Sequence, residues 1–291
     1  MMKEFTRGTF VRKFFKDNNL PFPVAEEWIL PYYSTIAGYE DLVGRWTDYI
    51  TLVESAGYNN YIDTKDKLEA TVHREITETA KYKELLSDKI EVGQLRTNVK
   101  RDLYKEDLVD KVYLSIDLKN ANFYALYKYG VVEDSTWSTW LSKFTKEESL
   151  LSSKALRQIV LGKLNNKRIT NIEKNIMIDI AESLVDVLPL NDLIVFNKDE
   201  LVYMVGDESQ LTLFPHLAES LPHCTVEQFT LRKTKFGFAK VYLDGKVSFH
   251  AVPKKYWLEN YKDFYNLPLI REDFLFLDED RNLCERLRRT P

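Results

Sequence analysis

Three carboxylates, those of Asp117, Asp199 and Glu200, stand where the sequence predicts strand ends. The apolar segment KVYLSI, residues 111–116, predicts a strand, and Asp117 follows it directly. The segment LIVFNKDELVYMV, residues 193–205, predicts a hairpin whose polar turn contains Asp199 and Glu200. If the first strand lies beside this hairpin, the carboxylates converge. Carboxylate oxygens suit Mg²⁺, which takes protein carboxylates together with substrate phosphates, so the chemistry would be phosphoryl transfer.

Basic residues lie between and after these acidic positions. Residues 154–168 hold five Lys or Arg and no acid, and they predict an amphipathic helix that could hold a triphosphate through charge-assisted hydrogen bonds. Residues 231–262 carry eight Lys or Arg against two acids, although the whole chain has a net charge of −4. Segregated basic stretches can bind a polyanion through one face. Solvated faces without any ligand explain the same pattern equally well.

The elements that must position these residues follow one another as strand, helices, hairpin, helix and strands. Residues 1–110 predict a mainly helical region, and residues 111–291 predict an α+β domain with an antiparallel sheet and a short C-terminal extension. The segment NANFYALYKYG predicts a short helix ended by Gly130. Trp137 and Trp140, three residues apart, are best explained as core packing.

Composition and motifs exclude several classes of protein. Cys224 and Cys284 are far apart and have no neighbouring Cys or His cluster, which excludes a disulfide scaffold and a zinc finger and fits a reducing cytoplasm. No apolar run approaches the ~20 residues that span a bilayer, so we expect no membrane partner. P-loop, GxSxG and GxGxxG motifs are absent.

The order of these features resembles the palm of family B DNA polymerases, particularly the phage and protein-primed members, over residues 110–250. DLKNANFYA, which begins at Asp117, stands where that family has Asp-x-x-Ser-Leu-Tyr-Pro-Ser. RQIVLGKLNNKRI resembles the family's basic helix that ends in Asn-Ser-x-Tyr-Gly. FNKDEL, residues 196–201, stands at the Tyr-Gly-Asp-Thr-Asp-Ser hairpin, and LRKTKFGFAKVY at the Lys-rich strand beside the primer–template duplex. The resemblance lies more in the order of elements than in identical residues.

The resemblance implies roles for particular residues. It implies that Asp117 and Glu200 bind Mg²⁺ or Mn²⁺ and that Asp199 is a further catalytic carboxylate. The residues that it implies for binding a nucleoside triphosphate are Arg157, Lys163, Asn165 and Asn122. Those that it implies for contact with the nucleic-acid backbone are Lys233, Lys235 and Lys240.

The chain departs from the family pattern at several of these positions. The first hairpin aspartate of the family falls at Lys198, whose charge would repel a cation or hold a phosphate instead. The second falls at Glu200, which can ligate Mg²⁺ but needs a shifted backbone because its side chain is longer. The family's ribose-checking tyrosine falls at Asn122. Its triphosphate lysine falls at Leu161, so basic residues on the same helix are the nearest substitutes.

We therefore expect a nucleotidyl-transferring palm module of viral type, located in the cytoplasm of the host cell, that acts on primed DNA or RNA. Because 291 residues are few for an independent replicase, we also expect a second protein subunit. The alternative is a palm-derived protein that has lost catalysis and binds nucleic acid or a protein partner. A third hypothesis is a structural or host-interaction protein whose resemblance to polymerases is accidental.

Each feature alone also has an ordinary structural explanation. Asp117 could be the N-cap of the helix that follows it. Residues 197–200 could be a solvated hairpin turn. Asn165 and Asn166 could end a helix, and residues 232–240 could be a charged edge strand that prevents sheet-to-sheet aggregation.

Overall fold

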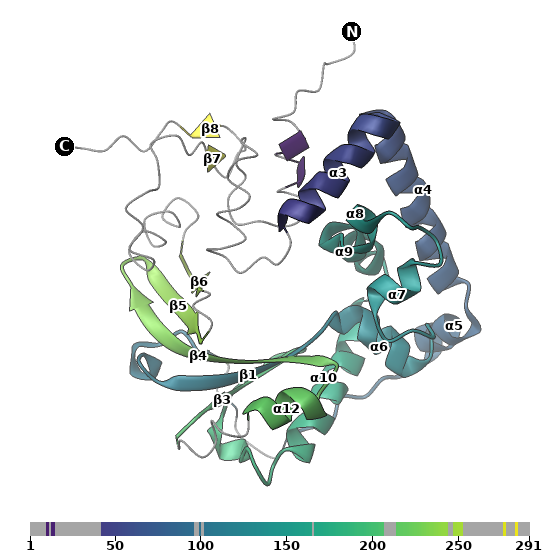
Figure 1. The fold of residues 1–291 in the computed structure, drawn as a ribbon. Coiled ribbons are helices and arrows are strands. Elements are labelled where there is room, and N and C mark those ends of the chain that lie inside the picture. The colour runs from purple at the N-terminus through teal and green to yellow at the C-terminus, as the bar shows by residue number, and fades with distance from the viewer. Residues whose placement is uncertain are drawn as a thin grey trace, which may run out of the picture.

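An antiparallel sheet and two groups of helices make up the part of the chain that the structure describes (Figure 1). This computed structural model describes residues 10, 11, 13, 14, 42–95, 99, 102–164, 166–206, 214–243, 247–252, 276, 277, 283 and 284. The strands of the main sheet are β1 (Val112–Leu118), β2 (Leu193–Phe196), β3 (Glu200–Met204), β4 (Cys224–Thr234), β5 (Gly237–Tyr242) and β6 (Val247–His250). A separate two-stranded sheet is formed by β7 (Phe276–Leu277) and β8 (Leu283–Cys284).

Helices precede the main sheet and connect its strands. Those before β1 are α3 (Leu42–Ala56), α4 (Tyr58–Thr77), α5 (Ala80–Ser87) and the 3₁₀ turn η2 (Glu106–Leu108). Those between β1 and β2 are α6 (Ala121–Tyr129), α7 (Trp137–Leu141), α8 (Glu148–Leu151), α9 (Lys154–Gly162), α10 (Asn166–Ser183) and the 3₁₀ turn η3 (Leu190–Asp192). The helix α12 (Phe214–Ser220) connects β3 to β4. The α+β class, the antiparallel sheet and the helical N-terminal region expected from the sequence are therefore confirmed.

The sheet has the strand order β2-β3-β1-β4-β5-β6, and every neighbouring pair is antiparallel. β1 and β2 consequently run parallel to each other with β3 between them. The helices α6 to α10 connect β1 to β2, and α12 connects β3 to β4. The first four strands thus follow the β-α-β-β-α-β order of a split β-α-β unit, which β5 and β6 extend.

Alternation along β1 separates a core face from a second face. Leu114, Ile116 and Leu118 lie in the larger hydrophobic core, to which α6, α10 and α12 contribute. The alternate residues, including Ser115 and Asp117, point to the opposite side of the sheet because successive strand side chains alternate. Part of that second face is covered by a smaller hydrophobic cluster of Leu103, Leu108, Tyr113, Ile194, Val195, Val202, Phe229, Leu231 and Phe238.

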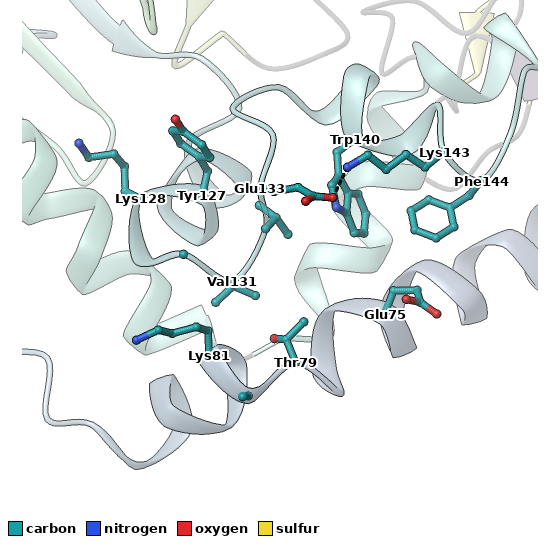
Figure 2. Close-up of a pocket in the computed structure, with 13 residues that line it drawn as sticks. Glu75, Thr79, Lys81, Tyr127, Lys128, Val131, Glu133, Trp140, Lys143 and Phe144 are labelled. Atoms are coloured by element: carbon teal, nitrogen blue, oxygen red, sulfur yellow. Dashed lines mark hydrogen bonds and ion pairs between the residues drawn. The ribbon is translucent and has the colours of Figure 1, made fainter.

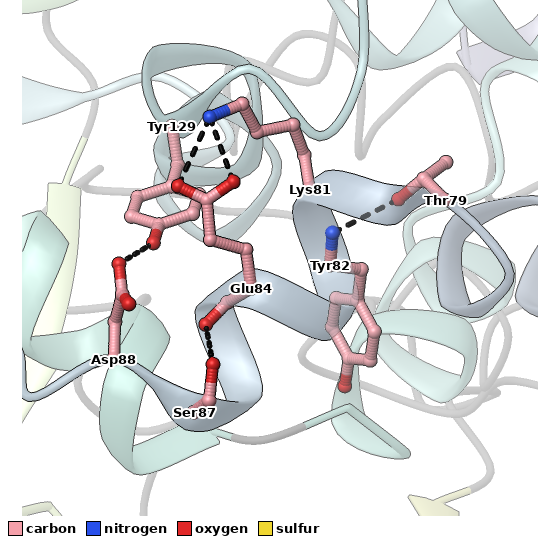
Figure 3. A network of polar contacts seen from close by, with 7 residues as sticks. All are labelled: Thr79, Lys81, Tyr82, Glu84, Ser87, Asp88 and Tyr129. Atoms are coloured by element: carbon pink, nitrogen blue, oxygen red, sulfur yellow. Dashed lines mark hydrogen bonds and ion pairs between the residues drawn. The ribbon is translucent and has the colours of Figure 1, made fainter.

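The N-terminal helical region is joined to the sheet-bearing part by polar contacts around α5. Tyr129 at the end of α6 donates a hydrogen bond to the carboxylate of Asp88, which follows α5 (Figure 3). Arg168 of α10 donates to the backbone carbonyl of Asp88. Asn171 and Asn175, also on α10, donate to the backbone of residues 90 and 91. These contacts fix α10 against the helical region.

Three local predictions need correction. The N-cap interpretation of Asp117 is wrong, because β1 includes Asp117 and the N-cap of α6 is Asn120, in the left-handed region at φ 51°. The basic helix predicted over 154–168 is two helices, because α9 ends at Gly162 and Asn166 begins α10. The edge-strand interpretation of residues 232–240 is wrong for residues 238–240 of β5, which pair with both β4 and β6, whereas residues 232–234 of β4 pair only with β5 among the described residues.

Other local predictions are confirmed. The hairpin of residues 193–205 forms as β2 and β3, and the Asn197 N–H donates to the Glu200 carbonyl at 2.8 Å to close its turn. Gly130 ends α6 in the left-handed region at φ 80°, which glycine adopts without Cβ strain. Trp137 and Trp140 are both buried, with ring centroids 6.0 Å apart, so they are core residues.

Candidate metal and nucleotide site

Asp117 of β1 and Glu200 of β3 are direct cross-strand partners. Side chains of directly opposed residues leave the sheet on the same face, with Cβ atoms about 4.5–5.5 Å apart. The backbone N–H of Leu118 donates to the Asp199 carbonyl at 2.8 Å, which ties the hairpin turn to the end of β1. The register of β1 and β3 therefore brings together the two carboxylates predicted as metal ligands, with Asp199 next to them.

The Glu200 carboxylate is held by three donors from three parts of the sheet. Its Oε1 accepts from Ser115 Oγ of β1 at 2.9 Å and from Lys240 Nζ of β5 at 2.8 Å. Its Oε2 has only a long contact of 3.5 Å with Asn197 Nδ2. Burial opposes ionisation of this carboxyl, but the charge of Lys240 and these hydrogen bonds outweigh it and lower the pKa of Glu200. Glu200 is therefore a carboxylate at neutral pH.

The Asp117 carboxyl is in a different electrostatic environment. It makes no hydrogen bond or ion pair with any residue that the structure describes. Desolvation by the surrounding protein, followed by the negative charges of Asp199 and Glu200, raises the pKa of Asp117 to about 7, although Lys240 opposes the rise. Asp117 as a whole residue is nevertheless exposed to solvent. Asp117 thus offers accessible acceptor oxygens beside the carboxylates of Asp199 and Glu200.

Lys198 connects the hairpin turn to a buried acid on α10. Its Nζ lies 3.6 Å from Glu173 Oε2 and 3.8 Å from Asp199 Oδ2. Glu173 is 0% exposed, and neither of its carboxylate oxygens accepts a hydrogen bond from a described residue. Burial raises the pKa of Glu173 to about 7, although the charge of Lys198 opposes the rise. The lysine at the family's first hairpin aspartate therefore contacts two carboxylates.

Lys240 reaches Glu200 because β5 and β6 rise from the plane of β1 and β3 (Figure 1). Two strands separate β5 from β3 in the sheet, yet the two side chains meet at 2.8 Å. The Lys240 side chain is only 6% exposed and its Nζ lies 4.7 Å from the centre of the Phe229 ring. The ring of Tyr104 stacks on His250 nearby, with centroids 4.5 Å apart. Burial, followed by the charge of Lys240, lowers the pKa of His250 to about 4, so this imidazole is neutral at pH 7.

The two basic residues predicted to bind a triphosphate make no contact with the carboxylates. Arg157 and Lys163 belong to α9 and its C-cap, and neither makes a hydrogen bond or ion pair with Asp117 or Glu200. Lys163 instead forms an ion pair with Glu69 of α4. Burial lowers the pKa of Arg157, whose guanidinium has no ion pair among the described residues. Asn122 is half-buried in the first turn of α6, and Asn165 lies outside the described residues.

The three lysines predicted to follow a nucleic-acid backbone divide into two groups. Lys233 and Lys235 are exposed at the β4–β5 hairpin, where their Nζ atoms lie 4.5 Å from the Phe238 ring centre and 4.9 Å from that of Phe236. Lys233 also pairs with Glu106 at 3.0 Å. Lys240, in contrast, is buried and paired with Glu200. The structure therefore places Lys240 with the carboxylates and not with the other two lysines.

The kind and number of ligand atoms determine which cation the carboxylates could bind. Among the described residues, no group of three or more His, Cys, Asp or Glu side chains is arranged to hold a metal ion. Two carboxylates suffice for Mg²⁺, which keeps several waters and accepts substrate phosphate oxygens as its other ligands. The unpartnered Asp117 and Oε2 of Glu200 supply oxygen donors of that kind. The residues present thus fit one hard divalent cation.

A pocket of about 940 Å³ lies elsewhere in the fold, between the junction of α4 and α5, the end of α6, and α7 (Figure 2). Tyr127, Trp140 and Phe144 contribute aromatic surface, and Lys143 on its wall pairs with Glu133 and with Asp134. None of the residues predicted to bind metal, nucleotide or nucleic acid lines this pocket.

Sequence reasoning missed two members of the carboxylate site, and each left a signal. Glu173 falls within the apolar stripe of α10, among the buried residues Ile169, Ile172, Ile176 and Met177. A lone acid within such a stripe indicates a buried carboxyl that needs a partner. Ser115 shares the period-2 face of β1 with Asp117, so alternation along the strand placed its hydroxyl beside the carboxylates.

No protein-family model matches the chain, and neither the curated proteins nor the solved structures contain a significant match. In the residues that the structure describes, no helix is both long enough and apolar enough to cross a membrane.

Proposed function

We propose that this chain is a nucleotidyl-transferring module of the polymerase-palm type that acts on primed DNA or RNA. The observation that carries the proposal is the direct pairing of Asp117 with Glu200 across β1 and β3. This pairing occurs in a sheet whose strand, helix, hairpin, helix and strand order is the one on which the sequence resemblance rests.

Asp117 and Glu200 would hold Mg²⁺ or Mn²⁺ in this function. When bound, the cation would polarise a phosphoryl oxygen of the nucleoside triphosphate. Ser115 and Lys240 keep the Glu200 carboxylate ionised and fixed on the site face. Asp199, beside Glu200, would be a further carboxylate near the cation.

The basic residues would hold the two anionic substrates. Arg157, which has no carboxylate partner among the described residues, would contact the triphosphate. Lys233 and Lys235, exposed at the β4–β5 hairpin, would contact the nucleic-acid backbone, whose binding should weaken steeply with salt.

A second candidate function is a palm-derived protein without catalysis that binds nucleic acid or a protein partner. The observation that favours it is the pairing of both hairpin carboxylates with lysines, Glu200 with Lys240 and Asp199 with Lys198. These ammonium groups neutralise charge that a cation would otherwise neutralise.

Primer extension tests the proposed function. Wild-type protein with a primed template, nucleoside triphosphates and Mg²⁺ or Mn²⁺ should extend the primer. Asp117→Asn and Glu200→Gln should each reduce the rate at least about 100-fold, because a lost cation ligand removes roughly 3 kcal/mol of transition-state stabilisation.

The matched control is Asp134→Asn, which removes a carboxylate that is paired with Lys143 beside the pocket of Figure 2. It should keep the wild-type rate. Extension that survives both site substitutions would contradict the proposed site. Tight, salt-sensitive binding of primed nucleic acid without extension would select the second candidate function.

A further inference from the structure

The pocket of Figure 2 shares no residue with the carboxylate site, and its size suits a small ligand. Its volume of about 940 Å³ is within the roughly 300–1,000 Å³ of small-molecule sites. We propose that this pocket binds a guanine nucleotide, either free or as one unit of a single strand. The proposal goes beyond the proposed function, because none of the residues assigned to metal, triphosphate or nucleic-acid backbone lines the pocket.

Three aromatic side chains give the pocket a surface on which a base can stack. The buried Trp140 ring lies 5.0 Å, centroid to centroid, from the ring of the half-buried Phe144 and so supports it from behind. Tyr127, also half-buried, lines another part of the wall. Beside Val131, a Cβ added to Gly130 would meet no atom within 4 Å apart from its chain neighbours, so the space there is open. An aromatic wall next to open space accepts a flat ring.

Two lysines lie at one end of the pocket (Figure 2). Lys128 is exposed and makes no ion pair or hydrogen bond with any residue that the structure describes. Lys81 pairs with Glu84 at 2.8 Å, but both side chains are about half exposed, so this pair is weak and can be exchanged for a ligand. Two ammonium groups at one end of the pocket favour an anionic group there, such as a phosphate.

Glu75 lies at the opposite end, on the side of Phe144 (Figure 2). Its only ion pair among the described residues is with its chain neighbour Arg74 at 3.9 Å, a distance too long for a hydrogen bond. Lys143, at the same end, already pairs with two other carboxylates. The Glu75 carboxylate can therefore accept hydrogen bonds from a ligand whose base stacks at this end.

Guanine satisfies these requirements better than the other bases do. Its N1–H and its amino group are neighbouring donors on one edge, so the two oxygens of one carboxylate can accept from both. Adenine presents an acceptor, N1, beside its amino group, and uracil has no amino group. With the guanine edge at Glu75, the phosphate on the far side of the ribose faces the end that holds Lys81 and Lys128.

Isothermal titration calorimetry of the whole chain with guanosine monophosphate (GMP), in EDTA so that no cation takes part, tests the proposal. We expect saturable binding of one GMP per chain, with AMP and UMP at least about tenfold weaker because they leave Glu75 oxygens unpaired. Glu75→Gln should remove the preference for GMP. Phe144→Leu should weaken binding by about tenfold, the size of one base–aromatic stack. Lys128→Gln should weaken the binding of GMP but not that of guanosine, which lacks the phosphate.

The matched controls are Glu78→Gln and Lys83→Gln, because both residues are exposed on or next to the same helices, α4 and α5, but do not line the pocket. Both variants should bind GMP as wild type does. Asp117→Asn should do so as well, since Asp117 is not a pocket residue. Circular dichroism verifies that each variant is folded.

Four results would overturn the proposal: no saturable binding of GMP at millimolar concentration, equal affinity for GMP, AMP and UMP, the same affinities in Glu75→Gln as in Glu78→Gln, or loss of GMP binding in Asp117→Asn. Competition against GMP by a single-stranded oligonucleotide with one guanosine among thymidines identifies the source of the ligand. An oligonucleotide that displaces GMP shows that the pocket takes a unit of a strand, and one that does not shows that it takes the free nucleotide.

Discussion

Glu173→Gln should make the stability of the protein less dependent on pH. Glu173 is fully buried on α10, and its only cationic partner among the described residues is Lys198, at 3.6 Å. Burial raises its pKa in the folded protein from 4.5 to about 7. The unfolded chain therefore releases this proton at lower pH than the folded protein does, and the free energy of unfolding falls as the pH rises from about 4.5 to about 7.

The size of the effect follows from the two pKa values. One pKa unit corresponds to about 1.4 kcal/mol, so a rise from 4.5 to about 7 amounts to roughly 3 kcal/mol of stability lost above pH 7. Glutamine cannot ionise, so the variant escapes this loss. We expect Glu173→Gln and wild type to be similarly stable at pH 4.5, and the variant to be more stable by roughly 3 kcal/mol at pH 8.

Urea denaturation followed by tryptophan fluorescence, at half-unit pH intervals from 4.5 to 8, measures this difference. Other groups with raised pKa values, such as Asp117, are present in both proteins and cancel in the comparison. A difference between variant and wild type that does not change with pH would show that Glu173 does not have a raised pKa in the folded protein. A variant less stable than wild type at pH 8 would show instead that the ionised Glu173–Lys198 pair stabilises the fold.

Three further predictions concern the sheet, α6 and nucleic-acid binding. Lys240→Met should lower the free energy of unfolding by about 2–3 kcal/mol, because it leaves the partly buried Glu200 carboxylate without its cationic partner. The double variant Lys240→Met/Glu200→Gln should recover part of that loss in the same urea assay. Gly130→Ala should cost about 1 kcal/mol, measured by thermal unfolding, because φ 80° strains any residue with a Cβ although the space around it is open. Lys233→Gln should reduce the slope of log affinity against log salt for primed DNA by about 0.9 if this lysine contacts a phosphate, and an unchanged slope would exclude that contact.

The sequence allowed prediction of those parts of the fold that local patterns determine. The run of residues 111–116, the hairpin of residues 193–205 and Gly130 after α6 each carry a strong local signal, and each forms as expected. The break between α9 and α10 was missed because the basic residues continue across it without a proline. α9 packs on α4 whereas α10 packs on α6, so the position of the break depends on tertiary contacts.

The candidate site could be predicted only in part, because some of its residues meet through the curvature of the sheet and not through a local sequence pattern. The pairing of Asp117 with Glu200 could be predicted once residues 111–117 and the hairpin of residues 193–205 were assigned as strands and β1 was placed next to β3. The position of Lys240 depends on the curvature of the sheet, which brings β5 over the site face and which no pattern within residues 237–242 encodes. The three lysines 233, 235 and 240 therefore looked alike in the sequence, whereas two are exposed and one is buried.

A crystal structure of the protein soaked with Mn²⁺, with diffraction data collected at the manganese absorption edge, would show whether Asp117 and Glu200 share one divalent cation. We expect one anomalous difference peak, bound by carboxylate oxygens of Asp117 and Glu200, with the Lys240 ammonium still on Glu200. A peak bound by other residues, or none at Asp117 at a Mn²⁺ concentration that saturates primer extension, would contradict this expectation.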